Sequence, residues 1–451
     1  MTTVFKGCAL ILALFSLAVG SVFAQDTPPA NAFGFKMSLD LGAQTFNGTG
    51  PDSGSFNFIG LSPDISFGKF GVGLDLIINY TLNGPPGAPV SNSFYIRASD
   101  WVPTSFQNFL SLYLSKFAYV RWGEKGDPLF IQFGSFKDAN LGDGFIMGNY
   151  NNTLFMPNDR HLGLQADLDG GLVKFPFVGL ETVVGNVATM DVLGGRIYVR
   201  PLMATQIPIF NNIEVGFTGV VDTGTNATIA HPATPVAVFG GDVQLPLVYM
   251  KDVFSLSAFT DLANIAGKST GAMVGVGGKV LNLISYGAQL RLLGAGFEPG
   301  YFSVAYDSYD AGRGTQYLAL QGAGSGGFTF GWSASMGTSF FNDKFIFLVK
   351  LDGPFYTTET DPSLSQPHLT GILSMAEGVI PGATFDFIYD KTQISSFASL
   401  VSPLNALIRA QLNFLTGGAV ISFVYNITYD LSHTPDHWVV QSGLQSSIPL
   451  F

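Results

Sequence analysis

The sequence predicts an all-β protein, a transmembrane antiparallel β-barrel of roughly 16–20 strands with one short helix and one loop folded into the lumen. Three observations support this prediction. Apolar and polar residues alternate with period two through most of the chain, only 12% of the residues are charged, and the last strand-like segment ends on the final residue, Phe451. A soluble protein with so little charge and 47% apolar residues would expose large apolar patches to water.

The chain begins with an export signal. Lys6 is the only charged residue among the first 24, an apolar run follows it, and Val22 and Ala24 stand three places and one place before the expected cleavage. The apolar run is about 17 residues long, shorter than the roughly 20 residues that span a bilayer as a helix. We therefore expect residues 1–24 to be removed and residues 25–451 to form a single barrel domain.

The predicted strands have one apolar and one polar face. Where both faces can be followed residue by residue, the charged residues stand on the polar face. Such alternation also suits a soluble β-sandwich, but segments of about 9–12 residues, low charge and aromatic residues near the segment ends favour a lipid-facing barrel. The clearest strands are residues 35–41, 72–82, 345–351, 408–414 and 421–430.

Two segments break the alternation. Residues 105–117 place their polar and apolar side chains on opposite faces of a helix that Ser105 is able to cap. Residues 138–161 are rich in glycine and asparagine and too long for a hairpin turn, so they are predicted to fold into the lumen; an external loop is the alternative. The plug residues proposed in this segment are Gly142, Gly144, Tyr150, Asn151 and Pro157.

Arginine and acidic residues on the polar faces are the candidate site residues. An arginine facing lipid at mid-depth costs about 2–4 kcal/mol, so these side chains are expected to face the lumen. There they either line an aqueous path or hold the folded-in loop through ion pairs, and both interpretations stay open. The candidates are Arg121, Arg160, Arg196, Arg200, Arg291, Arg409, Asp222 and Asp261.

No motif predicts an enzyme, a metal site or a cofactor. His433 and His437 are four residues apart, but Pro435 between them indicates a turn, and the glycine-rich residues 322–327 lack the lysine of a phosphate-binding loop. Removing the signal deletes Lys6 alone, which changes the net charge from −11 to −12. So acidic a chain is not expected to bind nucleic acid.

Three runs resemble a largely uncharacterised outer-membrane β-barrel family of spirochaetes and Bacteroidetes. They are FAYVRWGEKGDPLFIQFGSFKDANLGDGFIMGNYNNTLFMPNDRHLGLQADL (117–168), GGRIYVRPL (194–202) and YFSVAYDSY (301–309). The resemblance implies a barrel in the bacterial outer membrane, with no established activity. At the C-terminus, Gln445, Ser447 and Pro449 occupy the places where barrel-assembly signals carry apolar residues, and a bulge at Pro449 would restore the phase.

The function predicted from these features is a passive, porin-like channel for small solutes of unknown identity. The expected partners are outer-membrane lipid and the barrel-assembly machinery. A gated transporter for hydrophobic compounds, resembling fatty-acid uptake barrels, is an alternative suggested by the lumen-facing Ile77, Leu348 and Val424. A surface adhesin or purely structural barrel is a further alternative, which would need long loops.

Overall fold

The computed structural model describes most of the chain beyond the predicted signal. The described residues are 33–46, 50–86, 89, 93–154, 160–205, 207, 209–224, 235–251, 253–281, 283–307, 327–340, 345–355, 367–402, 406–416, 419–429 and 438–449. Several residues named from the sequence lie outside them, namely the signal, Pro157, residues 322–326, His433, His437 and Phe451.

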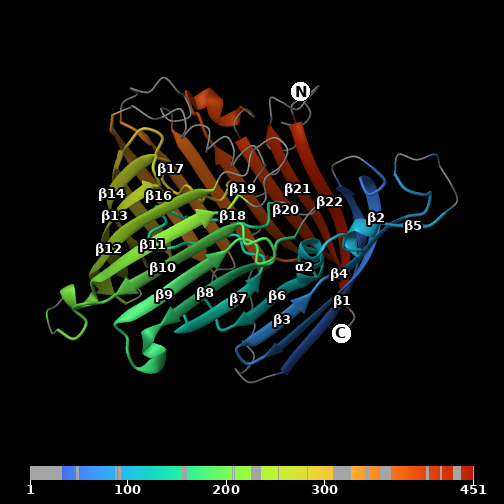
Figure 1. Ribbon diagram of the computed structural model, residues 1–451, viewed down its shortest axis with the longest axis horizontal. Helices are drawn as coiled ribbons and strands as arrows, with labels where there is room; N and C mark the ends of the chain where they lie inside the picture. The colour runs from blue at the N-terminus through green and yellow to red at the C-terminus, as the bar shows by residue number, and fades with distance from the viewer. Residues whose placement is uncertain are drawn as a thin grey trace.

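The described residues form one antiparallel sheet of 22 segments (Figure 1). The segments are β1 (Phe33–Phe46), β2 (Gly54–Phe67), β3 (Phe70–Leu74), β4 (Leu76–Thr81), β5 (Tyr95–Ile96), β6 (Phe117–Trp122), β7 (Leu129–Gly134), β8 (Gly163–Asp169), β9 (Val178–Val184), β10 (Val192–Val199), β11 (Glu214–Asp222), β12 (Val236–Met250), β13 (Phe254–Ile265), β14 (Ser269–Val280), β15 (Ile284–Leu293), β16 (Thr329–Phe340), β17 (Phe345–Pro354), β18 (His368–Ile380), β19 (Ala383–Lys391), β20 (Ala406–Thr416), β21 (Ala419–Tyr429) and β22 (Trp438–Pro449).

Two pairs of segments share a place in the wall. Gly73 of β3 pairs with Asp64, and Leu76 of β4 pairs with Leu61, in a single register on β2, so β3 and β4 are one strand interrupted at Asp75. β6 pairs with β3 and β5 with β4, so these two segments occupy the next place together. The wall therefore has 20 strands, and β1 pairs with β22 to close it. This confirms the predicted antiparallel barrel, with a strand number at the upper end of the expected 16–20.

Alternate residues of each strand face outward and inward. In β10, Ile197 and Val199 are exposed outside, whereas Arg196 and Tyr198 are buried inside. Large apolar side chains are exposed all around the outer face, and a closed wall with an apolar outer belt is the architecture of bacterial outer-membrane proteins. The belt includes Phe35, Leu61, Ile78, Phe217, Phe239, Leu262, Val274, Leu290, Phe330, Met336, Tyr425 and Leu444.

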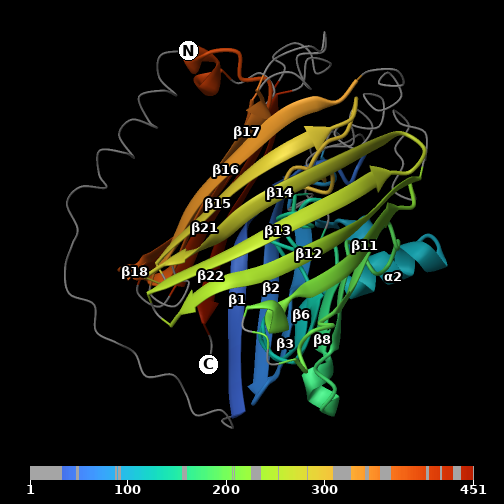
Figure 2. The same ribbon diagram turned by 90° about the vertical axis from the view of Figure 1, so that its left-hand side faces the viewer.

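The predicted helix is confirmed as α2 (Phe106–Leu114), which is shorter than expected at its C-terminal end. The Ser105 hydroxyl caps it by accepting a hydrogen bond from the Asn108 N–H at 3.1 Å. The chain turns at Ser115 and enters β6 at Phe117. Figure 2 shows α2 projecting from the side of the wall. In the part of the chain that the structure describes, no helix has the length and apolar character needed to cross a membrane.

Connections differ between the two ends of the barrel. At the end where β22 finishes, several hairpins are short, such as 68–69, 281–283 and 381–382. At the other end lie long connections, among them 135–162 and 294–328. Barrels of this class have short periplasmic turns and longer extracellular loops, so the second end is the extracellular one.

The last strand has a regular register up to Pro449. It runs without a shift on β21, and on β1 it continues to the pair of Ser38 with Pro449. Leu444 and Ile448 lie on the exposed outer face. The bulge or terminal irregularity expected at Pro449 would change the phase of residues 450–451, which lie outside the described residues, so it stays a prediction.

Candidate functional site: the filled lumen

The described residues between β7 and β8, 135–154 and 160–162, lie inside the barrel, and we call them the plug loop. Ala139, Met147, Tyr150 and Asn151 have no exposed surface, as expected for a segment enclosed by the wall. Gly142 and Gly144 adopt positive φ angles of 56° and 78°, which side chains with a Cβ rarely adopt. The predicted plug residues that the structure describes therefore lie in the lumen.

A second segment also lies inside the barrel, which the sequence analysis did not predict. Residues 294–307, after β15, run beside the plug loop, and we call them the inner segment. Met147 and Phe302 form a parallel bridge, and the Phe302 N–H donates to the Ile146 carbonyl at 3.1 Å. The Gly300 N–H donates to the Phe145 carbonyl at 2.7 Å. The available signal was an aromatic run at 301–306 without strand alternation.

Apolar side chains of the plug loop, the inner segment and the wall form one core inside the lumen. Leu141 and Met147 pack against Val192 and Val220 of the wall, with Phe302 also in the cluster. Close packing explains the small residues of β10, because a Cβ on Gly194 would lie 2.9 Å from Leu141 Cδ1. This side of the lumen is therefore filled with side chains.

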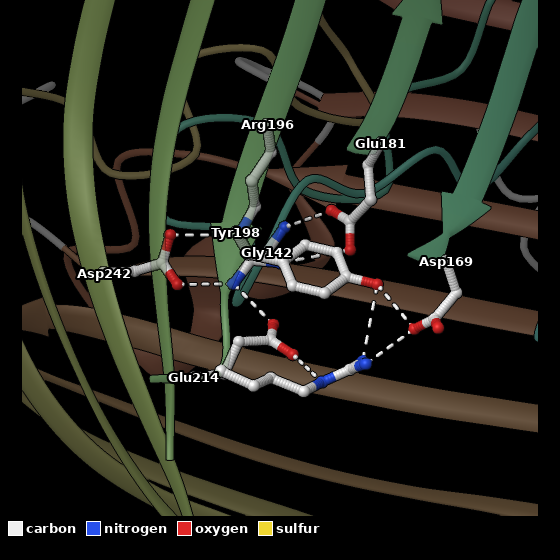
Figure 3. A network of polar contacts seen from close by, with 8 residues as sticks. Gly142, Asp169, Glu181, Arg196, Tyr198, Glu214 and Asp242 are labelled. Carbon is white, nitrogen blue, oxygen red and sulfur yellow. Dashed lines mark hydrogen bonds and ion pairs between the residues drawn. The ribbon is translucent and has the colours of Figure 1, made fainter. Parts of the chain in front are cut away.

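Arg196 is the centre of a network of polar contacts (Figure 3). Its side chain is 1% exposed and meets Asp242 in a two-atom fork, with Nε to Oδ2 at 3.0 Å and Nη2 to Oδ1 at 2.6 Å. It also contacts Glu181 at 3.1 Å and Glu214 at 2.8 Å. Glu181 accepts a hydrogen bond from the Gly142 N–H at 3.2 Å. Through Glu181, the buried guanidinium is linked to the backbone of the plug loop.

Tyr198 and Arg200 extend this network toward the end of β10. The Tyr198 ring lies between two guanidinium groups, with the carbons of Arg196 and Arg200 each 5.0 Å from its centre. Arg200 pairs with Asp169 at 2.7 Å and with Glu214 at 3.3 Å. Arg200 therefore joins neighbouring wall strands and does not touch the plug loop in these contacts.

Carboxylates gather beside Arg196. Asp242 of β12 stands opposite Asp261 of β13, and the charge of Asp242 acts on Asp143 of the plug loop. Burial is the main cause that raises the pKa of Asp143 to about 7, and the charge of Asp242 adds to it. Asp143 Oδ2 and Asp261 Oδ2 are buried without a hydrogen-bond partner among the described residues. One guanidinium therefore balances several acids at this point of the plug.

Other parts of the plug loop and inner segment meet strands elsewhere around the wall. Their partners in the wall are Asp75, between β3 and β4, and residues of β11 and β19–β21, so the contacts surround the lumen. The contacts are Arg160 with Asp75, Arg409 Nη1 with the Thr153 hydroxyl, Lys137 with Asp386 at 2.9 Å, Asn426 Nδ2 with the Leu154 carbonyl at 3.4 Å, and the Tyr306 hydroxyl with Asp222 at 2.7 Å. Within the lumen, the Tyr150 hydroxyl donates to Asp307 at 2.7 Å.

Besides Arg200, two further predicted arginines are not part of these plug contacts. Arg121 is half-buried on β6, and its Nε has no hydrogen-bond partner in the described part of the chain. Arg291 of β15 is 4% exposed and donates from Nε and Nη2 to Gln289 Oε1 at 2.9 and 2.7 Å. It also approaches Asp352 at 3.6 Å. Arg291 belongs to a second charged region of the lumen.

A cavity of about 170 Å³ lies between this region and the two lumen segments. Its wall side includes Arg291, Lys350 and His368, and its other side includes Asp143 of the plug loop and Glu298 of the inner segment. Since one water needs about 10–15 Å³, the space is large enough for several waters or a small polar solute. Of the three apolar lumen residues named from the sequence, only Leu348 lines it.

Most partners of the arginines in both regions were not predicted from the sequence. Glu181 stands opposite Arg196 in the β9–β10 register, and Lys350 and His368 come from adjacent strands. Their polar-face positions were visible as alternation, but the pairing that brings them together depends on strand register, which one sequence does not specify. Asp143 carried no signal beyond its place in the plug loop.

No protein-family model matches the chain, and no curated protein matches it. The resemblance to the spirochaete and Bacteroidetes family therefore stays a prediction beyond the barrel class.

Several solved barrels are similar to the chain at low identity. OccK5 (OpdH) of Pseudomonas aeruginosa is 8% identical over 93% of this chain and 98% of that chain, with a TM-score of 0.31. OpdK of the same organism, solved with vanillate, is 12% identical over 92% and 98%, with a TM-score of 0.30. Wzi of Escherichia coli, described as a carbohydrate-binding β-barrel involved in group 1 capsule assembly, is 12% identical over 92% and 84%, with a TM-score of 0.30. At these TM-scores the likenesses bear on neither the family nor the function of this chain.

Proposed function

We propose that this protein is a passive, porin-like channel of the bacterial outer membrane for small polar solutes. The observation that carries the proposal is the charged cavity between the plug loop, the inner segment and the β15–β18 part of the wall. A narrow, water-accessible space lined by charged side chains selects solutes by their charge and size. The chain acts without an enzyme activity or a cofactor in this proposal, after signal removal and insertion by the barrel-assembly machinery.

In this proposal Arg196 and the contacts around the wall hold the plug loop, which narrows the path. The network supports this role, because Glu181 connects Arg196 to the plug backbone and Arg409 reaches Thr153. Arg291 lines the solute path and does not hold the plug loop, since it borders the cavity. The two interpretations of the inward charges therefore apply to different residues.

Conductance of the purified protein in planar bilayers tests the proposal. We expect discrete ion-conducting steps, and larger steps for a variant in which a short glycine-serine linker replaces residues 138–161. A variant with a shortened β8–β9 connection, residues 171–175, which are exposed at the end of the wall, is the control and should keep the wild-type step size. Absence of conductance in both the wild type and the plug-deleted variant, with the barrel folded, would refute a channel function.

Transport of hydrophobic compounds gains little support from the lumen. The apolar side chains there pack against one another in the core of Leu141, Met147 and Phe302. The cavity itself is bordered by charged and polar groups, with Leu348 among its few aliphatic residues. An apolar solute would have to displace water from these groups without replacing their hydrogen bonds, which is unfavourable.

A further inference from the structure

The charges that border the cavity are sorted by sign. Its cationic residues, Arg291, Lys350 and His368, all come from the wall strands β15, β17 and β18. Its acidic residues, Asp143 and Glu298, come from the plug loop and the inner segment. A polar solute in this space therefore has cations on one side and carboxylates on the other.

The wall cations keep some capacity for a ligand. Lys350 Nζ approaches Asp352 at 3.5 Å and Arg291 Nη1 approaches it at 3.6 Å. Both distances exceed the usual N–H···O range of about 2.7–3.2 Å, so these are ion pairs without short hydrogen bonds. An ammonium group has three donors, and a solute carboxylate could accept one from Lys350. Asp352 itself does not border the cavity, so it balances the cations from behind.

The opposite side suits a cation. Asp143 Oδ2 is buried without a hydrogen-bond partner in the part of the chain that the structure describes. An ammonium group beside it would donate a charge-assisted hydrogen bond and balance the carboxylate. Asn140 and Asn149 of the plug loop border the same side and offer amide oxygens.

We propose that the cavity between the β15–β18 wall and the plug loop binds small zwitterionic solutes of the amino-acid type, with the carboxylate at Lys350 and Arg291 and the ammonium at Asp143 and Glu298. The proposal rests on the channel function proposed above and names its solute class. A solute carrying one charge alone would make a charged contact on one side of the cavity and none on the other. The volume of about 170 Å³ restricts the solute to a small one.

Four solutes of similar size and different charge test this selectivity. The flux of alanine, propionate, n-propylammonium and neutral propanamide is measured in liposomes that contain the full-length barrel, at pH 8 and with the membrane potential clamped at zero. We expect alanine to cross about tenfold faster than either singly charged solute, because a charged hydrogen bond is lost with each of them. At pH 8 Asp143, with a pKa of about 7, is mostly ionised.

Two variants separate the two ends of the solute. Lys350→Gln should lower the ratio of alanine to propanamide flux about tenfold through loss of the carboxylate contact, and Asp143→Asn should lower it through loss of the ammonium contact. Lys279→Gln, at an exposed position of β14, and Asp127→Asn, in the exposed β6–β7 turn, are the matched controls and should leave the ratio unchanged. A heat-dependent shift on SDS gels verifies that each variant is folded.

The outcomes separate this inference from the channel proposal. Flux of propanamide with no advantage for alanine, or an alanine flux that neither variant changes, would overturn the zwitterion site while leaving the channel intact. An equal preference for propionate and alanine that depends on Lys350 alone would replace it with an anion site. If none of the four solutes crosses, the channel proposal itself fails.

Discussion

Arg196 shows how a single residue organises the lumen. A buried guanidinium is stable only when its charge is compensated, and here it is compensated by Asp242, Glu181 and Glu214. The five N–H donors of the rigid guanidinium reach four carboxylate oxygens of these acids, whereas a lysine has only three donors. The buried network therefore fixes both the register of the neighbouring strands and the place of Gly142.

Replacing Arg196 should destabilise the protein strongly. In Arg196→Gln the acids around it lose their counter-charge, and breaking such a buried pair costs about 3–5 kcal/mol. The control is Arg200→Gln, whose side chain is 25% exposed and whose ion pairs are partly solvated, so a loss below about 1 kcal/mol is expected. Denaturant unfolding of the detergent-solubilised barrel measures both. Equal losses in the two variants would show that Arg196 has no special structural role.

Asp143 makes docking of the plug loop depend on pH. Burial first, and then the charge of Asp242, raise its pKa from 3.8 to about 7, while Arg196 and Gln244 act in the opposite direction. Since the docked loop binds the proton more tightly than a released loop would, docking is strongest below pH 3.8 and weakens as the pH rises to about 7. The other carboxylates that act on this region are Glu214 and Asp261.

The variant Asp143→Asn isolates this effect. Near pH 4 the wild-type carboxyl in the docked loop is protonated, so the two proteins should melt at similar temperatures. Above pH 7 the wild type buries a charge that the amide lacks, so the variant should melt at the higher temperature. Melting curves from pH 4 to pH 8 measure the difference, and a difference that stays constant across this range would contradict the assignment.

Among the elements, the plug loop and the inner segment stabilise each other. The described residues of the two segments contain no regular strand, yet backbone hydrogen bonds join them at Gly148, Gly300 and Phe302. Aromatic rings reinforce the contact, with Phe145 stacked 5.3 Å from Phe297. A pair of loops held in this way behaves as an internal element of the fold and not as two independent loops.

Hydrogen exchange should reveal this pairing. We expect the amides of residues 145–148 and 300–302 to exchange as slowly as those of the wall strands, because they are buried and hydrogen-bonded. The exposed β6–β7 turn, residues 123–128, provides the comparison and should exchange rapidly. Peptide-level mass spectrometry of the folded barrel measures both, and rapid exchange throughout the two lumen segments would show that they are not docked.

Elements that depend on local periodicity were predicted from the sequence, whereas those that depend on distant contacts were not. Alternation predicted the barrel, and the separation of polar and apolar residues over 105–117 predicted the helix, because both depend on local periodicity. The inner segment was missed because residues 294–307 are held by contacts with residues 145–148, which are distant in sequence. For the same reason Arg196 was placed inside the barrel, but its partners Glu214 and Asp242 were not identified.

For the whole molecule, closure of the wall predicts resistance to detergent. In the described part of the chain β1 pairs with both β2 and β22, and β22 pairs with β21, so neither the first nor the last strand leaves an open edge. The protein should fractionate with the outer membrane and migrate as a compact species on SDS gels without boiling, then shift on heating. Recovery in the soluble periplasmic fraction, or identical migration with and without heating, would contradict a membrane barrel.

The seam between β1 and β22 has a consequence for biogenesis. The ring cannot shut until the final strand has been translocated, whereas both lumen segments are made earlier and are anchored on each side by strands already in line. We therefore expect the plug loop and the inner segment to pack against the wall before β1 and β22 pair, because the closed barrel leaves little room for large rearrangement. Substitutions in the core of the plug loop and the inner segment are thus expected to lower the yield of folded barrel, because they delay the pairing of β1 with β22.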